Sequence, residues 1–80
     1  MREIIVGKKY KHFKGHVYIV KEIGYNSETY NELDKDESKM VVYEDIERHI
    51  VWIRPYEMFN SKVDKEKYPE VNQEYRFEEV

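Results

Sequence analysis

The fold is decided by residues 9–20, KYKHFKGHVYIV. Lys9–Lys14 predicts a first strand, and the Val, Ile and Tyr residues of Val17–Tyr25 predict a second, because β-branched and aromatic residues favour strands. Lys14-Gly15 predicts the tight turn between them, since glycine reaches positive φ without a steric cost. This stretch therefore predicts an antiparallel hairpin, from which a mainly β domain can be built.

Further strands are predicted along the rest of the chain. Met40–Tyr43 and His49–Arg54 each hold an apolar run that is too short for a helix. Pro55–Asn60 predicts one short helical turn, because proline suits the first position of a helix, and Tyr75–Glu79 predicts a last strand. Short strands without helical periods of about 10–15 residues predict an SH3-type barrel or roll, with five to six short antiparallel strands and one helical turn.

The segments between the strands give weaker signals. Ser27–Leu33 is either a loop or a short helical turn, and Glu44–Arg48 is either a turn or a single helical turn. Asp34–Lys39 is polar throughout, so we expect an exposed, mobile loop there. In the turn after Pro55 we expect Met58 and Phe59 to point inward.

Length and composition limit the class of protein. Eighty residues form a single domain, 1–80, because too little chain would remain to close a second core. The chain has no cysteine, which excludes disulfides, thiolate metal sites and a cysteine nucleophile. The N-terminus lacks a signal-peptide pattern, and no apolar run approaches the roughly 20 residues of a membrane-spanning helix. We therefore expect the protein in the cytosol. Separately, we expect a monomer.

Charge is distributed unevenly. The formal net charge is −3, but residues 1–24 hold six Lys or Arg against two Glu, whereas residues 25–50 hold three basic against eight acidic residues. The basic segment coincides with the predicted hairpin. Either its lysines keep strand edges from pairing, or they form a functional patch.

The sharpest candidate for a binding site is the segment WIRP, residues 52–55. Strand alternation places Trp52 and Arg54 on one face and Ile53 on the other, which we expect to point into the core. Tyr10, His12 and Lys14 share a face of the first strand in the same way. If the two faces coincide, an aromatic and mildly basic groove results, with Glu28 as a partner for Arg54. The candidate ligand-binding residues are Tyr10, His12, Lys14, Glu28, Trp52 and Arg54. In the alternative, Trp52 fills the core and Arg54 anchors the loop 27–29.

Several motifs together resemble a known bacterial family. They are Y-x-H-F-K-G-x-x-Y-x-V at 10–20, S-E-T at 27–29, V-V-Y at 41–43 and W-I-R-P-x-x-M-F at 52–59. In this order the motifs are similar to those of the domain of unknown function 1653 family. The resemblance runs from about Gly7 to Val63, with a weaker echo at Arg76-Phe77, so that residues 64–80 read as a C-terminal extension. It implies an SH3-type β-roll and carries no established activity.

Three departures from the family pattern stand out. Glu22 occupies a position where the family often has glycine, and Asn26 one where it often has histidine. Residues 31–39 resemble an insertion. If the family histidine has a chemical role, Asn26 cannot perform it, which weakens an enzymatic interpretation.

The residues support three classes of function unequally. His12 and His16 are four residues apart, but they flank the predicted hairpin turn instead of lying on a helix. They could approach each other across the turn, but two imidazoles without a fixed carboxylate make a weak site, and we expect no bound metal. No Gly-x-Ser-x-Gly elbow and no phosphate loop is present, so a hydrolytic or lyase enzyme has no motif to support it, and we expect neither catalysis nor a cofactor. The first hypothesis is a non-catalytic module that binds a protein segment or small ligand in the groove. The second is nucleic-acid binding through the basic hairpin, against which stands a sequence pI near 5.6.

Overall fold

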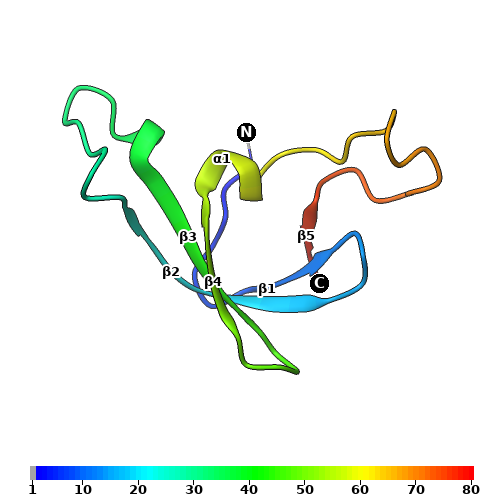
Figure 1. Ribbon diagram of the computed structural model, residues 1–80. Helices are drawn as coiled ribbons and strands as arrows, with labels where there is room; N and C mark the ends of the chain where they lie inside the picture. Colours follow the sequence, from blue (N-terminus) through cyan, green and yellow to red (C-terminus); the bar gives the residue numbers. More distant parts are fainter. Residues whose placement is uncertain (1) are drawn as a thin grey trace.

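One antiparallel sheet of five strands organises the computed structural model, which describes residues 2–80 (Figure 1). The strands lie in the order β4-β3-β2-β1-β5. Their bounds are β1 Lys9–His12, β2 Val17–Tyr25, β3 Lys39–Asp45, β4 Val51–Pro55 and β5 Phe77–Glu79. A 3-10 turn, η1 (Asp36–Ser38), precedes β3, and a short helix, α1 (Tyr56–Phe59), follows β4. The prediction of a mainly β domain with five to six antiparallel strands and one helical turn is confirmed.

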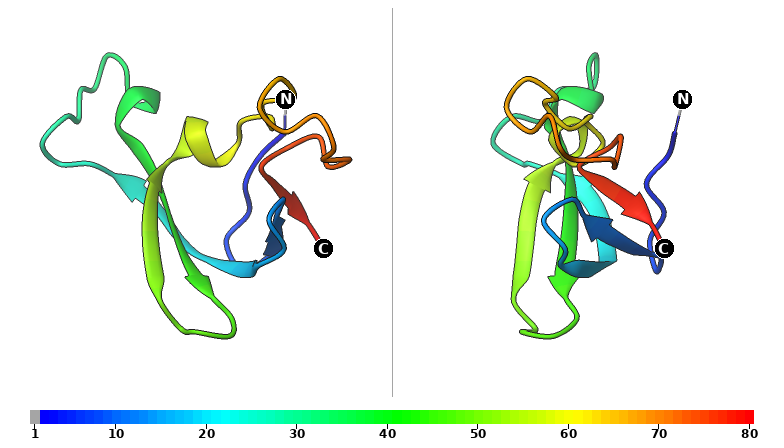
Figure 2. Two further views of the ribbon diagram at one scale, coloured as in Figure 1. Left: turned by 45° about the vertical axis from the view of Figure 1, so that its right-hand side comes forward. Right: turned by 90° about the vertical axis from the view of Figure 1, so that its right-hand side faces the viewer.

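The sheet is strongly bent but open. β2 is the longest strand. It pairs with β1 at 17–19 and with β3 from Tyr18 to Tyr25, with a register shift between Val20 and Glu22. This shift is a β-bulge, which bends a strand and increases its twist. The bend brings β5 round to face β3 and β4 (Figures 1 and 2). β4 and β5 remain unpaired with each other at the two edges, so strand pairing does not close the sheet into the barrel that the sequence suggested.

The β1–β2 hairpin turns at the predicted glycine. Gly15 has φ of 111°, a conformation that side chains with a Cβ rarely adopt, and its N–H donates to the His12 carbonyl over 2.8 Å. The His12 N–H donates in turn to the His16 carbonyl, also over 2.8 Å. The first strand therefore ends at His12 rather than Lys14, because the turn uses the residues in between.

The core is mostly aromatic and sits inside the bend of the sheet. Phe59 from α1 and Phe77 from β5 stack face to face, with ring centroids 4.0 Å apart and planes 7° apart. Tyr10 and Tyr43 pack edge-on against Phe59. The inward orientation of Phe59 is thus confirmed, whereas Met58 is 48% exposed and that prediction is wrong. A helix of one turn buries a single narrow face, and Phe59 occupies it.

The orientation of strand β4 differs from the prediction that Ile53 points into the core. Trp52 and Arg54 share a face, as alternation requires, but it is this face that turns toward the inside of the bent sheet, where both line a pocket with Tyr43 and Phe77. Ile53 points outward and is 65% exposed, so its expected place in the core is wrong. Because both faces of β4 carry a large apolar side chain, the pattern alone could not identify the inner one. The strand also includes Pro55, one residue beyond its predicted end.

The polar segment before β3 contains more structure than expected. Ser38 is 1% exposed within η1, and its Oγ donates to the Lys35 carbonyl over 3.0 Å. Its carbonyl accepts the Asn26 N–H over 2.7 Å, which ties the end of β2 to this segment. The prediction of an exposed loop at Asp34–Lys39 is wrong for Ser38, which is buried, and for Lys39, which begins β3. Its mobility stays a prediction.

The turn between β3 and β4 is built around a buried carboxylate. Asp45 is 1% exposed; its Oδ1 accepts the backbone N–H groups of Glu47 and Arg48, and its Oδ2 accepts the Arg48 Nε–H over 2.8 Å. These hydrogen bonds, led by the Arg48 backbone N–H, lower the pKa of Asp45 to about 2. His49 completes the turn in the left-handed region, with φ of 58°. A charged, locally bonded segment thus supplies the rigid connection to β4.

Candidate functional site

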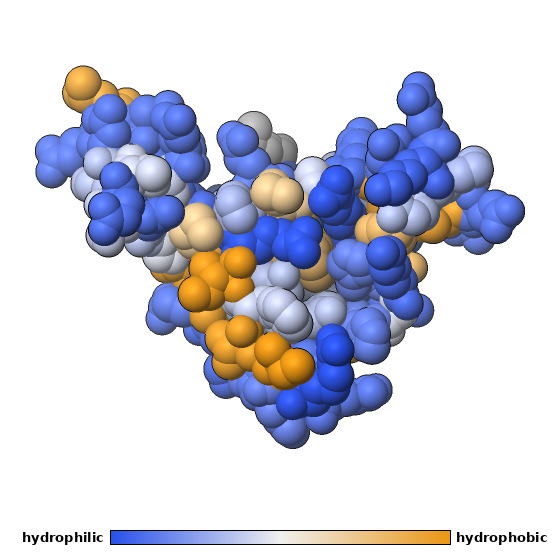
Figure 3. All heavy atoms as spheres, in the orientation of Figure 1, coloured by the Kyte–Doolittle hydropathy of each residue, from blue (hydrophilic) through white to orange (hydrophobic). Residues whose placement is uncertain are grey.

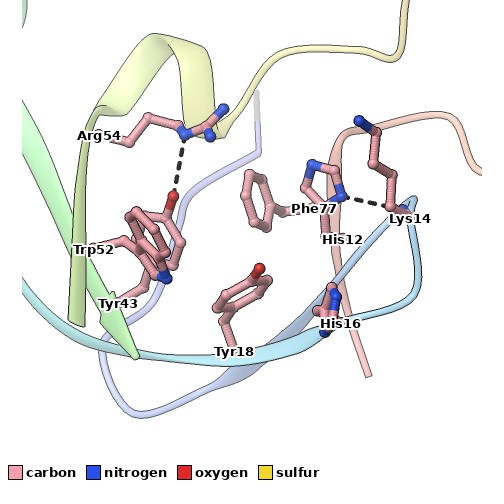
Figure 4. Close-up of a pocket in the computed structure, with 8 residues that line it drawn as sticks. All are labelled: His12, Lys14, His16, Tyr18, Tyr43, Trp52, Arg54 and Phe77. Carbon is pink, nitrogen blue, oxygen red and sulfur yellow. Dashed lines mark hydrogen bonds between the residues drawn. The ribbon is translucent and has the colours of Figure 1, made fainter. Parts of the chain in front are cut away.

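A cleft opens on the inner side of the bent sheet, between the β1–β2 hairpin, β3, β4 and β5 (Figure 4). Its volume is ≈ 270 Å³. We call it the aromatic cleft; the residues that line it are His12, Lys14, His16, Tyr18, Tyr43, Trp52, Arg54 and Phe77. A second cavity of ≈ 320 Å³ shares His12, Lys14 and Arg54 with it and adds Phe13, Asp64, Lys67, Tyr68 and Arg76.

The floor of the aromatic cleft consists of three buried rings. Tyr18 and Tyr43 meet edge to face with centroids 5.2 Å apart, and each contacts Phe77 edge-on, at 5.8 and 5.5 Å. Tyr18 comes from β2 and Tyr43 from β3, which are neighbouring strands, whereas Phe77 comes from the far edge of the sheet. Such edge-to-face contacts stabilise the rings in fixed orientations, so the floor is formed by rings steeply inclined to one another.

Arg54 lies over this floor with its charge unpaired. Its Nε–H donates to the Tyr43 hydroxyl over 3.1 Å, and its guanidinium carbon lies 5.5 Å from the centroid of the Phe77 ring. Among residues 2–80, no carboxylate lies within 4.0 Å of the Arg54 nitrogens. Trp52 stands beside it on the same face of β4 and remains 43% exposed. Arg54 is therefore held in place by aromatic groups, and the rest of its fork is free to bind an anion.

His12 contributes a fixed N–H donor. Its Nδ1 accepts the Lys14 backbone N–H over 3.1 Å, so the proton of the neutral ring resides on Nε2. The ring stacks on Phe13 and meets Phe77 edge-on, with centroids 4.4 and 4.8 Å away. Figure 4 shows it between the side chains of Arg54 and Lys14. Burial first, and then the charges of Arg54 and Lys14, lower the pKa of His12 to about 4.

The two adjoining cavities are positively charged. Lys14, Arg54, Lys67 and Arg76 line them, against Asp64 as the one carboxylate among their lining residues. A further carboxylate, Asp45, lies behind His16, 3.9 Å from its Nδ1, and is already bound by Arg48. Because the whole protein has a net charge of −3, this excess of positive charge is specific to the two cavities and does not reflect the overall composition.

The structure brings together four of the six residues that the sequence singled out: His12, Lys14, Trp52 and Arg54. Tyr10 is 2% exposed and lies deeper in the core, where its hydroxyl accepts the Ile5 N–H over 2.9 Å, so its expected place in the groove is wrong. Glu28 lies in an exposed turn, with its N–H bonded to Asn26 Oδ1 over 3.0 Å. Arg54 bonds to Tyr43 instead, so the expected pair with Glu28 does not form.

Sequence reasoning missed the floor of the cleft. Tyr43 could have been found, because an antiparallel hairpin of β3 and β4 places it opposite Trp52. Phe77 had no local signal, since it reaches the site only through the pairing of β5 with β1, in which it lies opposite His12. His16 was noted for its nearness to His12, and both line the cleft. Within residues 2–80, no cluster of three or more His, Cys, Asp or Glu side chains could hold a metal ion.

This combination defines a class: a small, mainly β domain with one open five-stranded sheet and a cationic cleft over an aromatic floor. Residues 8–79 match the sequence model of a family described as protein of unknown function (DUF1653), and the chain belongs to that family. The match includes the segment that contains β5. No curated protein and no solved structure matches the chain. None of the helices described is long and apolar enough to cross a membrane.

Proposed function

We propose that the protein is a non-catalytic binding module whose aromatic cleft binds a ligand that combines a flat, apolar part with an anionic group. Such a ligand is either a small molecule or a side chain or terminus of a protein segment. The observation that carries the proposal is the unpaired guanidinium of Arg54, which lies over the Phe77 ring and lines the same cleft as His12.

The geometry gives each part of the ligand a place. A planar ring can pack between Trp52 and the floor, where edge and face contacts with aromatic rings add to the burial of apolar area. A carboxylate or phosphate can accept from the free nitrogens of Arg54, with Lys14 close by. Because the pKa of His12 is about 4, its ring stays neutral at physiological pH and donates one hydrogen bond without adding charge.

The non-catalytic part of the proposal rests on the lining residues. They comprise aromatic rings, cations and a single carboxylate, without a serine or threonine that His12 could activate. The Nδ1 of His12 is bonded to backbone, which leaves only the Nε2–H facing the cleft. These features suit recognition better than proton transfer.

Nucleic-acid binding through the basic hairpin has less support. Tyr10, which lies between Lys9 and Lys11 in the basic hairpin, is buried and cannot stack on a base. Lys9 and Lys11 alternate with Tyr10 and His12 along β1, so they face away from the cleft, whereas Lys14 lines it. The lysines are thus divided between two faces and do not form one surface with the rings.

Phenyl phosphate, which has both a ring and an anion, is a direct probe, and the single tryptophan reports on it by fluorescence. We expect saturable binding that Arg54→Gln weakens about 10–100-fold, the size of a lost charge-assisted hydrogen bond. Lys14→Gln and Lys9→Gln form a matched pair, since both remove one exposed lysine from the hairpin. Only Lys14→Gln is expected to weaken binding. Equal losses from the two variants, or no saturable binding at all, would contradict the proposal.

A short single-stranded oligonucleotide tests the alternative with the same variants. Binding through the hairpin would be weakened similarly by Lys9→Gln and Lys14→Gln and would fall steeply with salt. Binding that responds to Lys14→Gln alone would place the oligonucleotide in the cleft and make it one source of the anionic ring.

A further inference from the structure

The two edges of the sheet are protected to different degrees. β5 has three residues, and Glu78 and Glu79 place charges along it. β4 has five residues, VWIRP, and its one charged side chain, Arg54, turns into the cleft. Exposed edge strands usually carry charges or are covered, because their free backbone groups can pair with another strand. β4 lacks this protection except for Pro55 at its end.

The outer face of β4 is apolar and exposed. Figure 3 shows a hydrophobic area over this strand and the turn before it. The exposed large apolar residues of β4 and of the turn before it, apart from Trp52, are Ile46, Ile50, Val51 and Ile53, which are 38%, 41%, 54% and 65% exposed. A contiguous apolar patch of this kind commonly marks an interaction surface.

The backbone of β4 offers hydrogen bonds in a defined pattern. The Asp45 N–H donates to the Ile50 carbonyl over 3.0 Å, which sets the phase of the β3–β4 ladder. In an antiparallel ladder, successive residues point their N–H and C=O groups alternately to the two sides. Trp52 and Arg54 therefore bond to β3, while Val51 and Ile53 direct their backbone groups away from the sheet.

This strand is complementary to itself. If two copies pair antiparallel about an axis through Ile53, the two Ile53 residues exchange both backbone hydrogen bonds, and each Val51 N–H meets the partner's Pro55 carbonyl. On the cleft face, Trp52 then lies directly opposite the partner's Arg54, close enough for a cation–π contact. On the other face, Ile53 lies against the partner's Ile53. The register thus pairs charge with ring and apolar with apolar.

We propose that the protein forms a two-fold symmetric dimer through β4, centred on Ile53. Such an interface uses the same patch on both copies and closes after two chains. It joins the two sheets into one of ten strands and places the two aromatic clefts on the same side of it, next to each other. The proposal rests on the free edge of β4 and does not depend on what the cleft binds, although Trp52 and Arg54 belong both to this interface and to the lining of the cleft.

Sedimentation velocity of the full chain tests the association. We expect the fraction of dimer to rise with concentration up to about 1 mM, as for a small, transient interface. Ile53→Lys places two like charges opposite each other at the axis, and we expect it to raise the dissociation constant at least about tenfold. Leu33→Lys is the control, because Leu33 is 96% exposed and lies far along the chain in a loop. A wild-type chain that stays monomeric at every concentration would overturn the proposal. The free edge of β4 would then be available to pair with a strand of another protein.

Single cysteines test the register, since the chain has none of its own. At the axis, the two Cα atoms of Ile53→Cys would lie about 5.5 Å apart, within reach of a disulfide. In Val51→Cys the two positions would lie about 14 Å apart along the ladder. Both sites are exposed, so we expect rapid cross-linking of Ile53→Cys and slow cross-linking of Val51→Cys under mild oxidation. Equal rates would overturn the proposed pairing.

Discussion

Replacing Trp52 by alanine tests whether Trp52 is part of the hydrophobic core or lines an open cleft beside it. Truncating a fully buried Phe or Trp costs about 3–5 kcal/mol of unfolding free energy. Trp52 keeps 43% of its surface exposed, so a little over half of that burial is at risk. We therefore expect Trp52→Ala to cost about 1.5–2.5 kcal/mol, which is half the buried value. The domain should still fold, because 80 residues support roughly 4–12 kcal/mol in total.

Two neighbouring positions calibrate this number. Phe77 is 1% exposed at the centre of the ring cluster, so Phe77→Ala should cost about 3–5 kcal/mol. Ile53 follows Trp52 directly but points outward, so Ile53→Ala should stay within about 0.5 kcal/mol of wild type. Since Phe77→Ala could unfold the chain, Phe77→Leu provides a milder variant at the same site. The predicted order of losses is Phe77→Ala, then Trp52→Ala, then Ile53→Ala.

Urea unfolding followed by far-UV circular dichroism measures all of these variants, because fluorescence is lost with the single tryptophan. A Trp52→Ala loss as large as that of Phe77→Ala would mean that Trp52 is part of the core and the cleft is closed in solution. A loss as small as that of Ile53→Ala would mean that the part of the Trp52 side chain that is buried contributes no stability.

Three further predictions concern titration and the hairpin. The pKa of His12 is about 4 in the folded chain against 6.5 when unfolded, so its contribution to stability should be complete above pH 6.5 and disappear as the pH falls to 4. NMR titration of the His12 ring should give a midpoint near 4, and a midpoint near 6.5 would refute its buried placement. The pKa of Asp45 is lowered to about 2, so its stabilising effect should be present above about pH 4 and disappear toward pH 2. Asp45→Asn should therefore flatten a plot of melting temperature against pH between pH 4 and 2, and an unchanged slope would count against the buried turn. Gly15→Ala should cost about 1–2 kcal/mol in urea unfolding through backbone strain alone, since nothing lies within 4 Å of the added Cβ; a neutral result would mean that the turn adopts another conformation.

Local sequence signals predicted the local elements well. The Val, Ile and Tyr residues of β2 predicted its bounds, and Gly15 predicted the hairpin turn, because both depend on the intrinsic preferences of neighbouring residues. Alternation also placed Trp52 and Arg54 on one face, and together with His12 and Lys14 it predicted half of the cleft's lining.

What the sequence could not predict depends on long-range packing. The sense in which β4 faces the core is set by the bend of the whole sheet, so alternation alone could not exclude an inward Ile53. Phe77 joins the site only because β5 pairs with β1, at the opposite end of the chain. The sheet is open because β4 and β5 do not pair with each other, and the sequence pattern of a short strand does not indicate which other strand it pairs with.

Binding of an anionic ring in the aromatic cleft is tested most directly by an NMR titration with phenyl phosphate, in which the chemical shifts of the amide and indole N–H groups are followed. We predict that the shifts concentrate on the Trp52 indole, His12, Lys14 and Arg54, and that the bound anion raises the midpoint of His12 by offsetting the charge of Arg54. Shifts confined to the outer face of β1 at Lys9 and Lys11, with the Trp52 indole and the His12 midpoint unchanged, would contradict the account.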